Sequence, residues 1–113
     1  MAFPGFYNIL YYRGDTSQFV IQPKVANGST FDLAGYTAAF TIATLRGPTG
    51  VQTAATAVVN ATTDIVTCTI TPAVGRTLSA GTYIYDVQIT NGTQIYTLLT
   101  GEVSVVNDVT GAV

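Results

Sequence analysis

The side chains that could carry chemistry in this sequence are six acids and one thiol, because histidine is absent. Without histidine the usual general base, the commonest metal ligand and most means of activating a nucleophile are missing. Paired carboxylates could still catalyse hydrolysis, and Asp86 and Glu102 stand on late strand-like segments that could be neighbours. Both acids, however, belong to the alternating sets of residues that we expect on the outward face. We therefore expect no enzymatic activity, no bound metal and no cofactor.

The remaining acids and the thiol have structural interpretations. Asp accepts hydrogen bonds from backbone amides at turns and strand ends, and four acids occupy such positions, namely Asp15, Asp32, Asp64 and Asp108. Cys68 lies in "VTCTI" between Val66 and Ile70 at period two, which favours a small core hydrophobe over a reactive thiol. A single cysteine also excludes an internal disulfide.

The segment "YYRGDTSQF", residues 11–19, contains Arg13-Gly14-Asp15, the tripeptide that extracellular ligands present to integrin-type receptors. A simpler interpretation is a turn between two strands. Gly14 permits a backbone reversal, and the Asp15 carboxylate and Thr16 hydroxyl can accept the amides that open the next strand. We expect the turn.

The composition predicts a single all-β domain. A chain of 113 residues fits one compact domain with a sizeable core. Only 9% of the residues are charged and 48% are hydrophobic, while threonine occurs 20 times. Threonine is β-branched and polar, so this bias favours pleated strands with hydroxyl groups on the outer face.

The charge pattern argues against nucleic-acid binding. The net charge is −2, and the four cations, Arg13, Lys24, Arg46 and Arg76, are scattered along the chain. A nucleic-acid surface needs a basic stripe that displaces counterions.

The sequence also shows neither a basic-then-apolar leader nor the roughly 20 apolar residues that a bilayer span requires. We expect a protein that is made in a cytoplasm and binds no membrane.

Strand signals recur at the spacing of a sandwich or barrel. The predicted strands, seven or eight in number, cover residues 6–12, 17–25, 36–45, 51–60, 64–72, 82–89, 93–100 and 102–106. The alanine-rich segment 51–60 is predicted at a sheet edge, and residues 73–81 could hold one helical turn. Asn91-Gly92 predicts a tight hairpin, and Gly101 predicts a β-bulge.

The stretch "LSAGTYIYD" favours one architecture. Leu-x-x-Gly-x-Tyr at the start of a penultimate strand is typical of an immunoglobulin-type tyrosine corner, in which Tyr83 would hydrogen-bond the backbone upstream. Tyr85 stands where an antibody domain has its second cysteine. We expect a disulfide-free, immunoglobulin-like antiparallel β-sandwich over residues 13–113, with a jelly roll or small barrel as the alternative.

The first twelve residues hold five of the twelve aromatic side chains, namely Phe3, Phe6, Tyr7, Tyr11 and Tyr12. Such a segment would be a solubility hazard if it were left in water. Two arrangements remain open. Residues 1–12 could form an aromatic arm that binds a neighbouring subunit through these five side chains, or they could fold back as the first strand of their own sandwich.

Five short motifs follow one another along the chain: Gly14-Asp15-Thr16, Asp32-Leu33-Ala34-Gly35-Tyr36, Gly81-Thr82-Tyr83-Ile84-Tyr85-Asp86, Gly101-Glu102-Val103 and Asp108-Val109-Thr110. This order resembles that of the small immunoglobulin-like modules of tailed-bacteriophage virions, which include the N-terminal domain of baseplate upper proteins. Those baseplate proteins continue into long stems, whereas this sequence ends at Val113. The resemblance therefore favours a free-standing module.

The resemblance implies a non-enzymatic structural protein, and it favours a capsid cement or decoration protein that braces the shell. Its partners would be the major capsid protein and neighbouring copies of itself, within a virion assembled in the host cytoplasm. Two alternatives stay open. One is a tail or baseplate adaptor, and the other is a carbohydrate-binding host-adhesion domain that stacks Tyr36 or Tyr96 against a sugar.

Overall fold

The computed structural model describes residues 5–24, 28–45 and 50–107, and the regular elements of this part of the chain are strands apart from one short helix. The elements are β1 (Gly5–Phe6), β2 (Ile9–Tyr12), β3 (Ser17–Ile21), β4 (Thr37–Ala43), β5 (Gln52–Asn60), β6 (Ile65–Ile70), α1 (Pro72–Gly75), β7 (Gly81–Thr90) and β8 (Ile95–Val106). The all-β prediction is confirmed. The predicted turn at residues 46–50 falls largely outside the described residues, as do Phe3 and the motif Asp108-Val109-Thr110.

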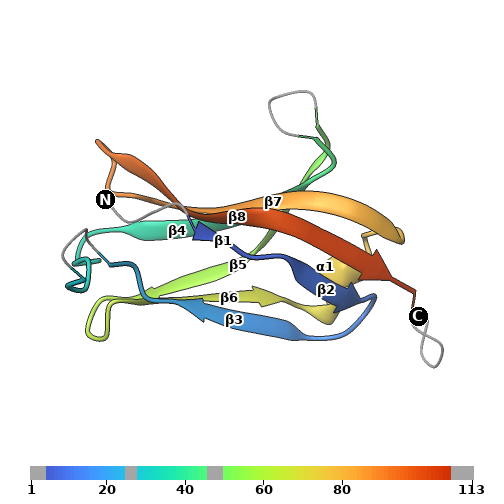
Figure 1. Ribbon diagram of the computed structural model, residues 1–113, viewed down its shortest axis with the longest axis horizontal. Coiled ribbons are helices and arrows are strands. Elements are labelled where there is room, and N and C mark those ends of the chain that lie inside the picture. The colour runs from blue at the N-terminus through green and yellow to red at the C-terminus, as the bar shows by residue number, and fades with distance from the viewer. Residues whose placement is uncertain (1–4, 25–27, 46–49, 108–113) are drawn as a thin grey trace.

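The strands form one curled, mixed sheet in the order β1-β8-β7-β4-β5-β6-β3, with β2 also beside β8. β5 joins its two halves, because Ala55 pairs with Phe40 of β4 whereas Thr56 pairs with Thr69 of β6. The sheet thereby turns back on itself, and two layers face each other (Figure 1). The first layer comprises β1, β2, β8, β7, β4 and the start of β5, and the second comprises the rest of β5, β6 and β3.

Two features of the sheet correct the sequence predictions. The strands are not all antiparallel, because β1 and β2 run parallel to β8, with Gly5 opposite Leu99 and Ile9 opposite Val103. The second correction concerns β5, which lies between β4 and β6 and is not an edge strand. The open edges are β1 with β2 in the first layer and β3 in the second.

The core lies between the layers, and in β6 it follows the alternation predicted around Cys68. Val66, Cys68 and Ile70 of β6 are fully buried, as are Phe40 and Ile42 of β4. In β7 the buried residues are Tyr85, Val87 and Ile89. The second layer reaches the first through the Phe19 ring of β3, whose centroid lies 5.5 Å from that of Phe40 and 6.2 Å from that of Tyr85.

β8 is one continuous strand, and its β-bulge lies at Leu98 and not at Gly101. Val87 pairs with Leu99 and Gln88 with Thr97, which leaves Leu98 as the extra residue. Gly101 pairs regularly with Tyr85. Gly101 serves close packing, since a Cβ at this position would overlap the carbonyl oxygen of Tyr7.

The predicted helical turn is present but short. α1 begins after Thr71, whose hydroxyl accepts a hydrogen bond from the Val74 amide at 3.3 Å. Gly75 at its end is buried against the Tyr11 side chain, and a Cβ there would overlap the tyrosine hydroxyl. α1 therefore packs directly on β2.

Candidate partner-binding surface

The N-terminal segment folds back onto its own sheet, and it exposes alternate side chains. Ile9 and Tyr11 of β2 point into the core, with exposed fractions of 6% and 1%. Phe6, Leu10 and Tyr12 have the opposite parity and are exposed by 81%, 64% and 49%. Period-two alternation in a half-buried strand explains this division.

The exposed side chains form one surface with the end of β8. Tyr12 pairs with Val106, which is 38% exposed, and the outward side chains of Phe6 and Leu10 continue the row along β1 and β2. We call Phe6, Leu10, Tyr12 and Val106 the N-terminal patch. Leu10 and Val106 were not among the residues that the sequence predicted for partner binding, because Ile9–Tyr12 are all large and largely apolar and show no alternation that distinguishes the two faces.

The other predicted partner-binding residues have different places. Tyr11 lies in the core, where its hydroxyl donates to the Asp15 carbonyl oxygen at 2.7 Å and burial raises its pKa, so it is not available at the surface. Tyr7 is half exposed, and its ring centroid lies 5.8 Å from that of Phe19 across the open side between the layers. Phe3 lies outside the described residues.

The N-terminal ladder is interrupted at Tyr7 and Asn8, and side chains bridge the interruption. The Tyr7 amide donates to the Thr100 carbonyl oxygen at 3.1 Å. The Asn8 Oδ1 atom accepts from the Glu102 amide at 3.1 Å, in place of a backbone acceptor. The buried Tyr85 hydroxyl donates to the Tyr7 carbonyl oxygen at 2.5 Å, and burial raises the pKa of Tyr85.

Arg13-Gly14-Asp15 lies in the turn between β2 and β3, as predicted. Gly14 has a φ of +91°, and the Asp15 amide donates to the Tyr12 carbonyl oxygen at 3.0 Å. The Arg13 guanidinium donates to the carbonyl oxygens of Leu78 at 2.9 Å and Arg76 at 2.7 Å. The Arg13 side chain therefore fixes the segment that follows α1 and has a structural role.

Tyr83 makes a local backbone contact at the start of β7. Its hydroxyl donates to the Ser79 carbonyl oxygen, four residues upstream, at 3.0 Å. The side chain is only half-buried, whereas Tyr85, two residues later, is almost completely enclosed.

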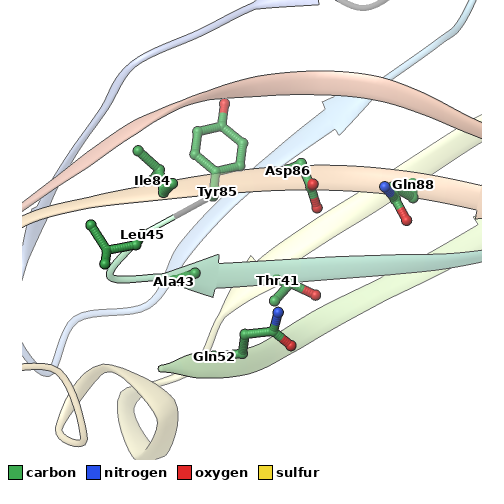
Figure 2. Close-up of a pocket in the computed structure, with 8 residues that line it drawn as sticks. All are labelled: Thr41, Ala43, Leu45, Gln52, Ile84, Tyr85, Asp86 and Gln88. Carbon is green, nitrogen blue, oxygen red and sulfur yellow. The ribbon is translucent and has the colours of Figure 1, made fainter. Parts of the chain in front are cut away.

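A shallow groove of about 340 Å³ lies on the outer face of the first layer, over β4, β5 and β7 (Figure 2). Thr41, Gln52, Asp86 and Gln88 provide its polar groups, and Leu45 lies at its apolar end. The groove shares a face with the N-terminal patch, because pairing runs from Thr41 to Asp86, Thr100 and Phe6 across four strands.

The predicted acid pair also lies on this outer face. Asp86 pairs with Thr100, and Glu102 pairs with Ile84, so the two acids are diagonal neighbours on β7 and β8. Within the ranges that the structure describes, Cys, Asp and Glu do not gather in any group of three or more that could hold a metal ion.

The two tyrosines proposed for sugar stacking are part of an aromatic cluster. The ring centroids of Tyr36 and Tyr96 lie 6.4 Å apart, and Phe31 lies 5.6 Å from Tyr36 and 5.8 Å from Tyr96. All three side chains are half-buried. Each ring is thus engaged by the other two.

Comparison of the sequence with models of protein families and with curated proteins finds no match. Among the described residues, none of the helical structure is long and apolar enough to cross a membrane. The geometry provides a two-layered body with an exposed apolar patch at one edge and a polar groove on the same face. Such a face is suited to contact with another protein.

Proposed function

We propose that the protein is an immunoglobulin-like virion module of a tailed bacteriophage that braces capsid subunits as a cement protein. The strand neighbours support the immunoglobulin-like assignment. One layer brings together β4, β7 and β8, and the other brings together β3, β6 and the second half of β5. This arrangement corresponds to the C-F-G and B-E-D groupings of an immunoglobulin sandwich.

Motif residues that carry the resemblance occupy positions where turns and strand starts need them. Gly14 has the positive φ of the β2–β3 turn. Asp32 Oδ1 accepts from the Ala34 amide at 2.9 Å, and Asp64 Oδ1 accepts from the Leu33 amide at 3.1 Å, which together order the approach to β4. The Tyr83 hydroxyl bonds the backbone upstream, as a tyrosine corner requires.

The observation that carries the functional proposal is the N-terminal patch. Phe6 of β1 and Leu10 and Tyr12 of β2 are large side chains that remain exposed, although Ile9 and Tyr11 on the other face of β2 are buried in the core. Aromatic and aliphatic anchors at the centre of an interface contribute most of its binding energy. Repetition of such a contact over a shell adds avidity that a single copy lacks.

Location in the particle tests the proposal directly. Virions of the phage that encodes the chain are separated into heads and tails, and the chain is identified by mass spectrometry. Presence on heads supports the cement function, presence on tails replaces it with the adaptor alternative, and absence from both contradicts a virion role.

A matched pair of variants tests the patch. Leu10 and Val20 are both exposed aliphatic residues on edge strands, at 64% and 62%. Leu10→Ser should abolish incorporation into particles, whereas Val20→Ser on the other layer should leave it unchanged. Equal incorporation of the two folded variants would contradict the patch as the anchor.

Carbohydrate binding is a second candidate that one observation favours. The groove in Figure 2 presents a carboxylate, two amides and a hydroxyl, from Asp86, Gln52, Gln88 and Thr41, which are groups that can hydrogen-bond sugar hydroxyls. Its volume of about 340 Å³ falls at the lower end for ligand sites. A glycan array probed with the native chain and with Gln88→Ala would test it, and retention of all binding by the variant would exclude this groove.

A further inference from the structure

The first and last strands of the described chain lie side by side and run in the same direction. β1 and β2 pair with β8 in parallel, from Gly5 opposite Leu99 to Tyr12 opposite Val106 (Figure 1). A pull that separates the N-terminal end of β1 from the C-terminal end of β8 is therefore directed along both strands. It loads the hydrogen bonds between them together, because these bonds run across the direction of the pull.

We propose that this parallel ladder is a mechanical clamp that makes the protein resist stretching between its N-terminal and C-terminal sides. Load that enters at Gly5 reaches β3 only after β2 has left β8. The clamp must therefore break before the rest of the sheet is stressed. The inference goes beyond the proposed function, since it depends on strand topology and not on which partner the protein binds.

The clamp is reinforced where its ladder would otherwise be weakest. At the interruption between β1 and β2, the Asn8 side chain bonds the Glu102 amide, and the Tyr85 hydroxyl bonds the Tyr7 carbonyl. Gly101 allows this close approach, because any Cβ there would overlap the Tyr7 carbonyl oxygen. Side chains from β7 and from the N-terminal segment itself thus continue the attachment across the gap.

The far end of the ladder is also fixed. The Arg13 amide donates to the Val106 carbonyl oxygen at 2.8 Å, and the Arg13 guanidinium donates to the carbonyl oxygen of Leu78. Between the two ends, Ile9 and Tyr11 are buried in the core. Sliding β2 along β8 would therefore break backbone bonds, side-chain bonds and core packing in one step.

Force spectroscopy on the full chain tests the clamp by comparing two directions of pull. In the first, handles are attached at the two chain ends, which shears the ladder. In the second, handles are attached at the N-terminal end and at a thiol introduced by Ile95→Cys, an exposed position at the start of β8. Both attachment points then lie toward the same end of the ladder, so the pull peels β1 and β2 away pair by pair.

We expect the unfolding force to be at least about twofold higher in the shearing direction, because forced unfolding depends on the barrier and shearing breaks many bonds at once. Asn8→Ala should lower that force. Gln18→Ala, which removes a side-chain bond from Gln18 to Thr69 at 3.2 Å between β3 and β6, should leave it unchanged. Circular dichroism is the control that checks whether both variants are folded.

Equal forces in the two directions would overturn the proposal, as would an equal loss of force in the two variants. All of these measurements use the isolated chain. A negative result in these measurements would contradict the clamp but not the virion proposal. Absence of the chain from virions would contradict the virion proposal but not the clamp.

Discussion

The hydroxyl of Tyr85 lies 2.5 Å from the carbonyl oxygen of Tyr7, a residue 78 positions earlier in the chain. Tyr85 is 2% exposed, so this bond joins the N-terminal segment to the core of the first layer. A hydrogen bond from a core side chain thus ties together two segments that lie far apart in the sequence.

Removing this hydroxyl should cost stability. Tyr85→Phe keeps the ring but leaves the Tyr7 carbonyl oxygen without its buried donor, and we expect a loss of about 1–3 kcal/mol in the free energy of unfolding. Urea denaturation measures it. Tyr83→Phe is the matched control, because its bond to Ser79 lies at the surface and its loss should cost less. Equal losses of unfolding free energy in the two variants would show that the bond to Tyr7 stabilises the fold no more than a surface bond does.

Gly101 should tolerate no side chain. Gly101→Ala places a methyl group against the Tyr7 backbone, which cannot rotate away, and overpacking of this kind costs about 1–3 kcal/mol. The Ile9 and Tyr11 amides should then exchange their hydrogens faster. Gly92→Ala strains a φ of +96° but meets open space, so it should leave those amides protected. Unchanged exchange in Gly101→Ala would contradict the close approach.

Two substitutions in the Arg13-Gly14-Asp15 turn between β2 and β3 can distinguish a structural role from a receptor-binding role. Arg13→Ala should lower the free energy of unfolding by about 1–2 kcal/mol, because two carbonyl oxygens lose a charged donor. Asp15→Ala, at an exposed position, should change stability by less than about 0.5 kcal/mol. Neither variant should alter attachment to integrin-bearing cells. Loss of attachment in folded Asp15→Ala would reveal a receptor ligand.

Stability should fall in alkaline solution. Burial raises the pKa of Cys68 from 9.0 to about 12, so above pH 9 the unfolded chain loses the thiol proton while the folded chain keeps it. The folded state then binds more protons, and the free energy of unfolding decreases as the pH rises through this window. Burial of Tyr85 acts in the same direction.

The quantity to measure is the slope of the free energy of unfolding against pH. Cys68→Val removes the titrating group while keeping an apolar side chain of similar size, and it should make the decline shallower between pH 9 and pH 12. Comparing slopes avoids any constant effect of the substitution on packing. An unchanged slope would mean that Cys68 ionises equally in both states.

The strands and their buried faces could be predicted because local patterns determine them. Period-two alternation identified the inward residues of β6, including Cys68, and Gly14 indicated the turn between β2 and β3. The direction of β1 and β2 could not be predicted, because parallel pairing with β8 depends on contacts about 94 residues apart, and no local pattern encodes it. The same ladder explains why Gly101 was misassigned to a bulge.

The candidate surface was only partly predictable. Aromatic content drew attention to residues 1–12, but composition does not distinguish a side chain that faces the core from one that faces water. Only the pairing with β8 places Tyr11 inside and Tyr12 outside. The groove depends on Thr41, Gln52 and Asp86 coming from three strands, and a local pattern along one segment does not reveal that convergence.

The passage of β5 from one layer to the other has a consequence for self-association. A flat sheet has two free margins and can extend indefinitely in both directions, as in amyloid growth. Here β5 connects the two layers along one flank, and the edge strands, β1 with β2 in one layer and β3 in the other, belong to the opposite flank. Both open edges lie on the same flank, so the described strands provide no edges on opposite sides from which a fibre could extend in two directions.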